Sequence, residues 1–84
     1  MTETIDQALE RCSGDPAWLC DQLERWPVRV HQERTTSITY LNETASAIIT
    51  AASVSDDLPP PLDRPMVERM TAALATFRRR NRGL

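Results

Sequence analysis

The chain has 84 residues, of which 40 % are hydrophobic and 26 % are charged, and its formal net charge is −2. This composition is ordinary for a globular protein, and the length predicts one small domain that buries only about 60 to 65 % of its unfolded surface. No apolar run approaches the ~20 residues that cross a membrane, and the acidic start, MTETIDQALE, lacks the apolar segment of a secretory signal. We therefore expect a cytoplasmic protein that does not bind membranes.

The charged residues are unevenly distributed. Residues 1–24 contain six acids and one base, whereas residues 69–84 contain five arginines and no acid. This asymmetry is typical of an interaction tail, or of two ends that attract each other within one chain or between two copies. All ten basic residues are arginine, whose codons are GC-rich, so we expect a GC-rich bacterium or its phage as the source.

The first predicted helix spans residues 5–12. Thr4 and Gln7 have the spacing of a capping box, and Gly14 is placed to end the helix. The apolar residues lie at helical spacing on one face: Ile5, Ala8, Leu9 and Cys12.

A second helix is predicted over residues 16–26, with Asp15 as its N-cap and Pro16 as its first residue. Its buried face comprises Leu19, Cys20, Leu23 and Trp26. Trp18 falls on the polar side of this helix. It is either covered by the rest of the fold or exposed as a binding hot spot, where tryptophan is enriched. The two short helices are expected to form an antiparallel hairpin.

A third, central helix is predicted over residues 36–55, with a short β-hairpin over residues 28–41 as the alternative for its start. One apolar face consists of Ile38, Leu41, Ala45, Ile48, Ile49 and Ala52. A second apolar side consists of Tyr40, Ala47, Ala51 and Val54. A helix that is apolar on two sides is usually buried on two sides. The second side is therefore covered either by other helices of this chain or by a partner.

A proline-rich connector, residues 56–63, precedes the last predicted helix, residues 64–80. Three consecutive prolines stiffen the connector, which we interpret as a linker rather than a polyproline ligand. Asp63 is the predicted N-cap, and the apolar face of the helix comprises Met66, Val67, Met70, Ala73, Leu74 and Phe77. Residues 1–84 are thus expected to form a single all-α domain, a small four-helix bundle of two short and two longer helices.

Residues suited to catalysis or metal binding are few. Cys12 and Cys20 are separated by seven residues, which matches no common zinc or redox motif, so we predict buried thiols rather than a disulfide or metal ligands. His31 is the single histidine, and its polar surroundings are those of an ordinary connector. We expect no metal, no cofactor, no small-molecule substrate and no catalytic residues.

The C-terminus, TFRRRNRGL, contains Arg78, Arg79, Arg80 and Arg82. Arginine suits phosphate recognition, but the sequence pI of about 5.3 and the absence of interleaved aromatic residues argue against a nucleic-acid arm. Successive helical residues point about 100° apart, so the first three arginines form a collar around the helix end. Cations are favoured at this position, and we expect the collar to contact carboxylates of this or another protein.

These observations predict a non-enzymatic interaction protein: an adaptor, an inhibitor or an accessory subunit. The expected partner is another protein or a second copy in a homodimer, bound through Trp18, Tyr40, Ala47, Ala51 and Val54. The alternative is a small regulator that binds nucleic acid through the four C-terminal arginines.

Overall fold

The computed structural model describes residues 3–25 and 37–81, and all regular structure in these ranges is helical. The helices are α1 (Ile5–Glu10), α2 (Pro16–Arg25), α3 (Ile38–Ser53) and α4 (Arg64–Arg80). The described part of the chain therefore confirms the predicted all-α fold of two short and two longer helices.

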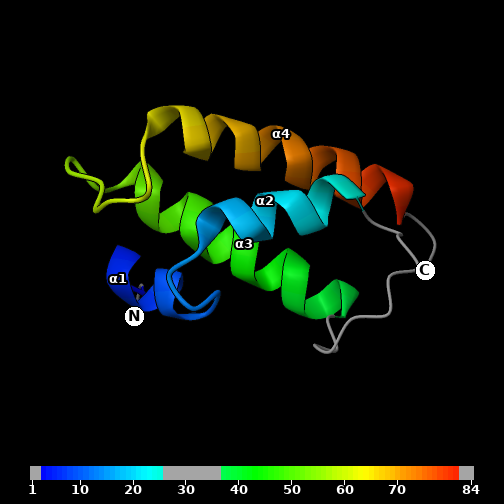
Figure 1. The fold of residues 1–84 in the computed structure, drawn as a ribbon, viewed down its shortest axis with the longest axis horizontal. Coiled ribbons are helices and arrows are strands. Elements are labelled where there is room, and N and C mark those ends of the chain that lie inside the picture. Colours follow the sequence, from blue (N-terminus) through cyan, green and yellow to red (C-terminus); the bar gives the residue numbers. More distant parts are fainter. Residues whose placement is uncertain (1–2, 26–36, 82–84) are drawn as a thin grey trace.

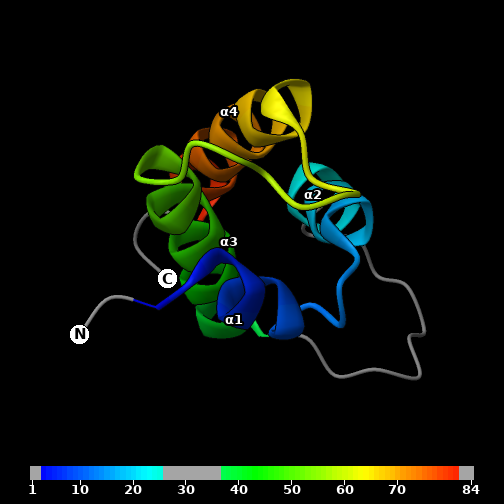
Figure 2. The same ribbon diagram turned by 90° about the vertical axis from the view of Figure 1, so that its left-hand side faces the viewer.

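The helices pack in a different order from their order along the chain. The contacts of α2 are mainly with α4, those of α4 extend also to α3, and α1 packs on α3. Figure 1 shows α2, α3 and α4 running along the long axis of the molecule, with α1 near the end where α3 finishes. In the end-on view of Figure 2, α1 lies beneath α3 while α2 lies beside α4. The two short helices are consecutive, but each packs mainly on a different long helix.

Helix α1 begins as predicted and ends early. The Gln7 amide donates to the Thr4 hydroxyl at 3.1 Å, and the Thr4 amide donates to the Gln7 side chain at 3.0 Å, which completes the capping box. The helix ends at Glu10, two residues before the predicted end. Ser13, with φ of 58°, already adopts the left-handed conformation one residue before Gly14, with φ of 70°.

Helix α2 follows directly after this turn. The Trp18 amide donates to the Asp15 carboxylate at 3.0 Å, so Asp15 is the N-cap, as predicted. The apolar face is buried as expected through Leu19, Cys20 and Leu23. The predicted contribution of Trp26 lies outside the described residues.

Helix α3 is shorter than predicted. Ser37 is its N-cap and accepts a hydrogen bond from the Tyr40 amide at 3.0 Å, and Val54 follows its last residue. Residues 38–41 are helical, so this part of the alternative β-hairpin is wrong, and residues 28–36 lie outside the described part. The buried residues of α3 are Leu41, Ala45, Ile48 and Ala52 from one predicted side, Ala51 from the other, and Thr44, which belongs to neither.

The proline-rich connector is attached to the core. Leu62 is 2 % exposed and Leu58 packs against the core, while Asp56 and Asp57 are exposed. Asp63 caps α4 by accepting a hydrogen bond from the Met66 amide at 2.9 Å. The bounds of α4 are those predicted, and its fully or nearly buried residues are Met70, Ala73, Leu74 and Phe77.

Candidate functional site

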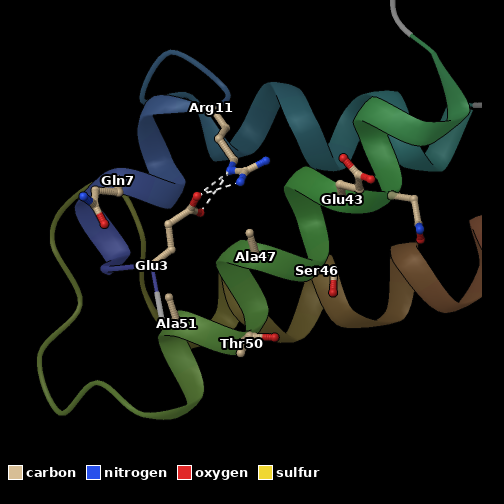
Figure 3. Close-up of a pocket in the computed structure, with 9 residues that line it drawn as sticks. Glu3, Gln7, Arg11, Glu43, Ser46, Ala47, Thr50 and Ala51 are labelled. Atoms are coloured by element: carbon tan, nitrogen blue, oxygen red, sulfur yellow. Dashed lines mark hydrogen bonds and ion pairs between the residues drawn. The ribbon is translucent and has the colours of Figure 1, made fainter. Parts of the chain in front are cut away.

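A groove runs between α1 and α3. Its volume is about 650 Å³, and it is partly open to solvent. Figure 3 shows α1 forming one wall and α3 forming the other wall and the floor. The lining residues are Glu3, Gln7, Arg11, Asn42, Glu43, Ser46, Ala47, Thr50 and Ala51.

Four of the residues that line the groove from α3 have small side chains. Ser46, Ala47, Thr50 and Ala51 share one face because residues three and four apart are neighbours on a helix. Ala51 is buried, Ser46 and Ala47 are half-buried, and Thr50 is exposed. A floor of this kind lets the backbone of a bound segment approach α3 closely.

The α1 wall carries an ion pair. The Nε of Arg11 donates to both carboxylate oxygens of Glu3, at 2.9 and 3.0 Å, and Nη2 donates to one of them at 2.6 Å. The hydrogen bonds from Arg11 lower the pKa of Glu3, and the same contacts raise the pKa of Arg11. Both side chains remain partly exposed, at 43 % for Arg11 and 32 % for Glu3.

Tyr40 connects the two walls. Its hydroxyl donates a hydrogen bond to the carbonyl oxygen of Arg11, and its ring is half-buried against the core. Tyr40 therefore fixes the end of α1 on α3 and helps to set the width of the groove.

The predicted partner-binding residues do not form one surface. Ala47 and Ala51 line the groove, whereas Tyr40 and the half-buried Trp18 pack against the core of this chain. Val54 is 76 % exposed and follows the end of α3. The second apolar side of α3 is thus covered in part by α1 and left in part as the groove.

A smaller hollow of about 310 Å³ lies between α2 and α4, lined by Glu24, Arg69, Ala72, Ala73, Thr76 and Arg80. Arg69 donates from Nε and Nη2 to the carboxylate oxygens of Glu24 at 2.9 and 2.7 Å. The hydrogen bonds from Arg69 lower the pKa of Glu24. This pair links the two helices across the hollow.

Two arginines of the collar form hydrogen bonds with other helices of the same chain. Arg78 donates to the side-chain oxygen of Asn42 on α3 at 2.8 Å, and Arg80 donates to the carbonyl oxygen of Glu24 on α2 at 3.0 Å. Arg79 donates to Thr76 on its own helix at 3.3 Å. These contacts go to a side-chain amide oxygen, a backbone carbonyl oxygen and a hydroxyl oxygen, and the expected contact with carboxylates stays a prediction. Arg82 lies outside the described residues.

Comparisons with protein-family models, with curated proteins and with solved structures find no match.

The two cysteines are buried free thiols, as predicted. Burial raises the pKa of Cys12 and raises the pKa of Cys20 to about 11. Within residues 3–25 and 37–81, no group of three or more histidine, cysteine or acidic side chains is placed to hold a metal ion. No helix in those ranges is long and apolar enough to span a bilayer. His31 lies outside the described residues, so the expectation that it is not catalytic stays a prediction.

The sequence does not predict most of the groove. Its patterns assign Glu3, Gln7 and Arg11 to a capped helix and its flanks, and Ser46 and Thr50 to a solvated polar face. The spacing of Gln7 and Arg11, four residues apart, indicates a shared face of the first turns. No pattern in the sequence indicates that this face lies opposite α3.

Proposed function

We propose that the protein is a non-enzymatic interaction module that binds a segment of a partner protein in the groove between α1 and α3. It would serve as an adaptor, an inhibitor or an accessory subunit in the cytoplasm of a bacterium or phage-infected cell. The observation that carries this proposal is the groove itself, which joins a floor of small side chains to polar walls.

The shape and chemistry of the groove suit a helical or extended segment. Peptide recognition commonly places a helix in a groove, with apolar side chains on the floor and polar contacts at the edges. Ala47 and Ala51 supply the apolar floor, while Gln7, Ser46 and Thr50 supply hydrogen-bonding groups along its sides. The volume of about 650 Å³ is enough for a few side chains of such a segment.

Contacts within the chain hold the two walls of the groove in place. Ala8 and Leu9 anchor α1 in the core, and the hydrogen bond from Tyr40 to Arg11 fixes the end of this helix on α3. A preformed site lowers the entropy cost of binding, which supports recognition by a surface this small.

The proposal is tested by obstructing the groove. In Thr50→Arg, a long charged side chain enters the groove from an exposed position on α3. The matched control is Thr71→Arg, the same substitution at an exposed position on α4 that does not line the groove. Wild type and both variants are used as affinity baits in extracts of the native host, with mass spectrometry of the captured proteins.

We expect one protein or a small set to be captured by wild type and by Thr71→Arg, and to be lost with Thr50→Arg. Circular dichroism and thermal unfolding of each variant establish that the bait is folded. Equal capture by all three baits would contradict the assignment of the groove.

Self-association, which the second apolar side of α3 suggests, is tested separately by sedimentation velocity. A homodimer formed through the groove would dissociate in Thr50→Arg and persist in Thr71→Arg. A wild-type protein that sediments as a monomer at all concentrations would rule out the homodimer and leave another protein as the partner.

A second candidate function is nucleic-acid binding through the arginine collar. It is favoured by the exposure of Arg78, Arg79 and Arg80 in the last turn of α4. It has less support than the groove because Arg78 and Arg80 already bind Asn42 and Glu24. Fluorescence anisotropy with a single strand and a duplex at several salt concentrations tests it. A steep salt dependence that becomes shallower when the three arginines are changed to glutamine would support it, and an unchanged slope would exclude it.

A further inference from the structure

We propose that Arg11 is a carboxylate-binding site within the groove, occupied in the free protein by Glu3 and taken over by an acidic side chain of the bound partner. This inference rests on the proposed function and specifies the partner chemistry: a helical segment with a glutamate or aspartate directed at Arg11.

The geometry shows that the site accepts a carboxylate. Three nitrogen-to-oxygen distances between 2.6 and 3.0 Å join the guanidinium of Arg11 to both oxygens of Glu3. Figure 3 shows the two side chains meeting over the groove, with Glu3 reaching toward Arg11 from the start of the chain. Because a planar guanidinium binds any carboxylate through the same fork of N–H groups, an acid from another chain would find the same contacts.

The carboxylate of Glu3 is suited to exchange. Glu3 precedes the N-cap of α1, and its side chain has no part in the buried core. Both members of the pair are partly exposed, and exposed ion pairs contribute little to stability because water and salt screen them. Replacing Glu3 therefore costs the fold little.

Arg11 remains in place during the exchange. Its carbonyl oxygen accepts the hydrogen bond of Tyr40, so the residue is held on α3 independently of its side-chain partner. Glu43 lines the groove from the α3 side, and its charge acts on Arg11. A second carboxylate near Arg11 is repelled by Glu43, so neutralising Glu43 should strengthen the binding of an acid.

The test uses two blocked alanine-rich peptides of about 18 residues, a length that supports an isolated helix. They differ only at the central residue, which is glutamate in one and glutamine in the other. Each is titrated into the isotope-labelled protein while NMR follows the Arg11 Nε–H signal and the amides of residues 43–51. We expect saturable shifts at these positions, with the glutamate peptide binding about two- to fivefold more tightly.

Three variants assign this difference to the Glu3–Arg11 pair. Glu3→Gln removes the carboxylate that competes for Arg11 within the chain, and it should increase the affinity for the glutamate peptide about two- to fivefold. Asp6→Asn is the control and should have a smaller effect, because Asp6 is an exposed acid on α1 that forms no ion pair with Arg11 in the described part of the chain. Glu43→Gln should increase the affinity for the same peptide. Arg11→Gln should abolish the preference for the glutamate peptide over the glutamine peptide.

Equal affinities of the two peptides for wild type, or equal effects of Glu3→Gln and Asp6→Asn, would overturn the inference, as would a failure of both peptides to shift the groove signals. Glu3→Gln keeps the test decisive if Arg11→Gln does not fold. The proposed function fails separately, when Thr50→Arg retains the captured partner. If Thr50→Arg loses the partner while the two peptides bind with equal affinity, the groove remains the proposed partner-binding site and the proposed carboxylate site at Arg11 is rejected.

Discussion

Among the residues that the structure describes, Leu23 and Val54 represent the two extremes of burial for an aliphatic side chain. Leu23 is fully buried in the core, whereas Val54 is 76 % exposed beyond the end of α3. Truncation of each side chain to alanine therefore separates the loss of packing from the general effect of substitution.

Leu23→Ala should lower the free energy of unfolding by about 2 to 5 kcal/mol, since it removes buried methyl groups and leaves a cavity. Val54→Ala should change it by less than about 0.5 kcal/mol, because the side chain is largely in water already. Urea unfolding monitored by circular dichroism measures both. Similar losses in the two variants would contradict the placement of Leu23 in the core.

Cys20 should be chemically inert in the folded protein. Burial raises the pKa of its thiol to about 11, and its sulfur lies 3.7 Å from the sulfur of Met66. Because the thiolate is the reactive form, alkylation by iodoacetamide at about pH 8 should be slow for the native protein and fast in urea. Mass spectrometry of timed samples measures the rates, and rapid native alkylation at Cys20 would show that α2 opens readily.

Individual caps were predictable because they depend on residues a few positions apart. Thr4, Asp15 and Asp63 cap the helices that they were predicted to cap. The sequence does not predict the environment of Trp18. A helical wheel of α2 shows the side of the helix on which Trp18 lies, but it does not show which other element packs there. Trp18 is half-buried and packs against the core.

At the scale of elements, the ends of α1 and α3 differ from prediction for local reasons. The apolar periodicity of residues 5–12 continues past Glu10, but the Gly14 amide donates to the Leu9 carbonyl at 2.8 Å and closes the helix. In α3, the apolar pattern includes Val54, which lies outside the regular helix. Periodicity reports which residues face the core, and hydrogen bonds at the ends determine where the helix stops.

The Glu24–Arg69 pair links α2 to α4 and should make this contact sensitive to acid. Since the folded-state pKa of Glu24 lies below its usual value of 4.5, the pair stabilises the protein above that pH. The contribution is lost as the pH falls through the lowered pKa, where the carboxylate of the folded protein becomes protonated.

Glu24→Gln should therefore lower the Tm slightly at neutral pH, and the difference from wild type should shrink as the pH falls below 4.5. Glu68→Gln is the matched control, because Glu68 is an exposed carboxylate on α4 that has no ion pair with another described residue. Calorimetry at several pH values makes the comparison. A Tm difference that grows toward low pH would contradict the assigned pairing.

At the scale of the whole molecule, the sequence predicts the number of helices better than their arrangement. Helical periodicity identified each element, but the packing of α1 on α3 and of α2 on α4 joins residues far apart in the chain. The groove is a product of that arrangement. Ala47 and Ala51 belong to the predicted second apolar side of α3, yet the wall opposite them comes from residues 3–11.

The most direct test of the central claim is to map the bound partner onto the protein. The isotope-labelled chain is titrated with the captured partner, and the amide shifts are recorded by NMR. We predict that the largest shifts fall at residues 7–11 and 43–51, on the two sides of the groove, with small shifts in the last turn of α4. Shifts concentrated at Arg78, Arg79 and Arg80, with the groove unchanged, would contradict the account.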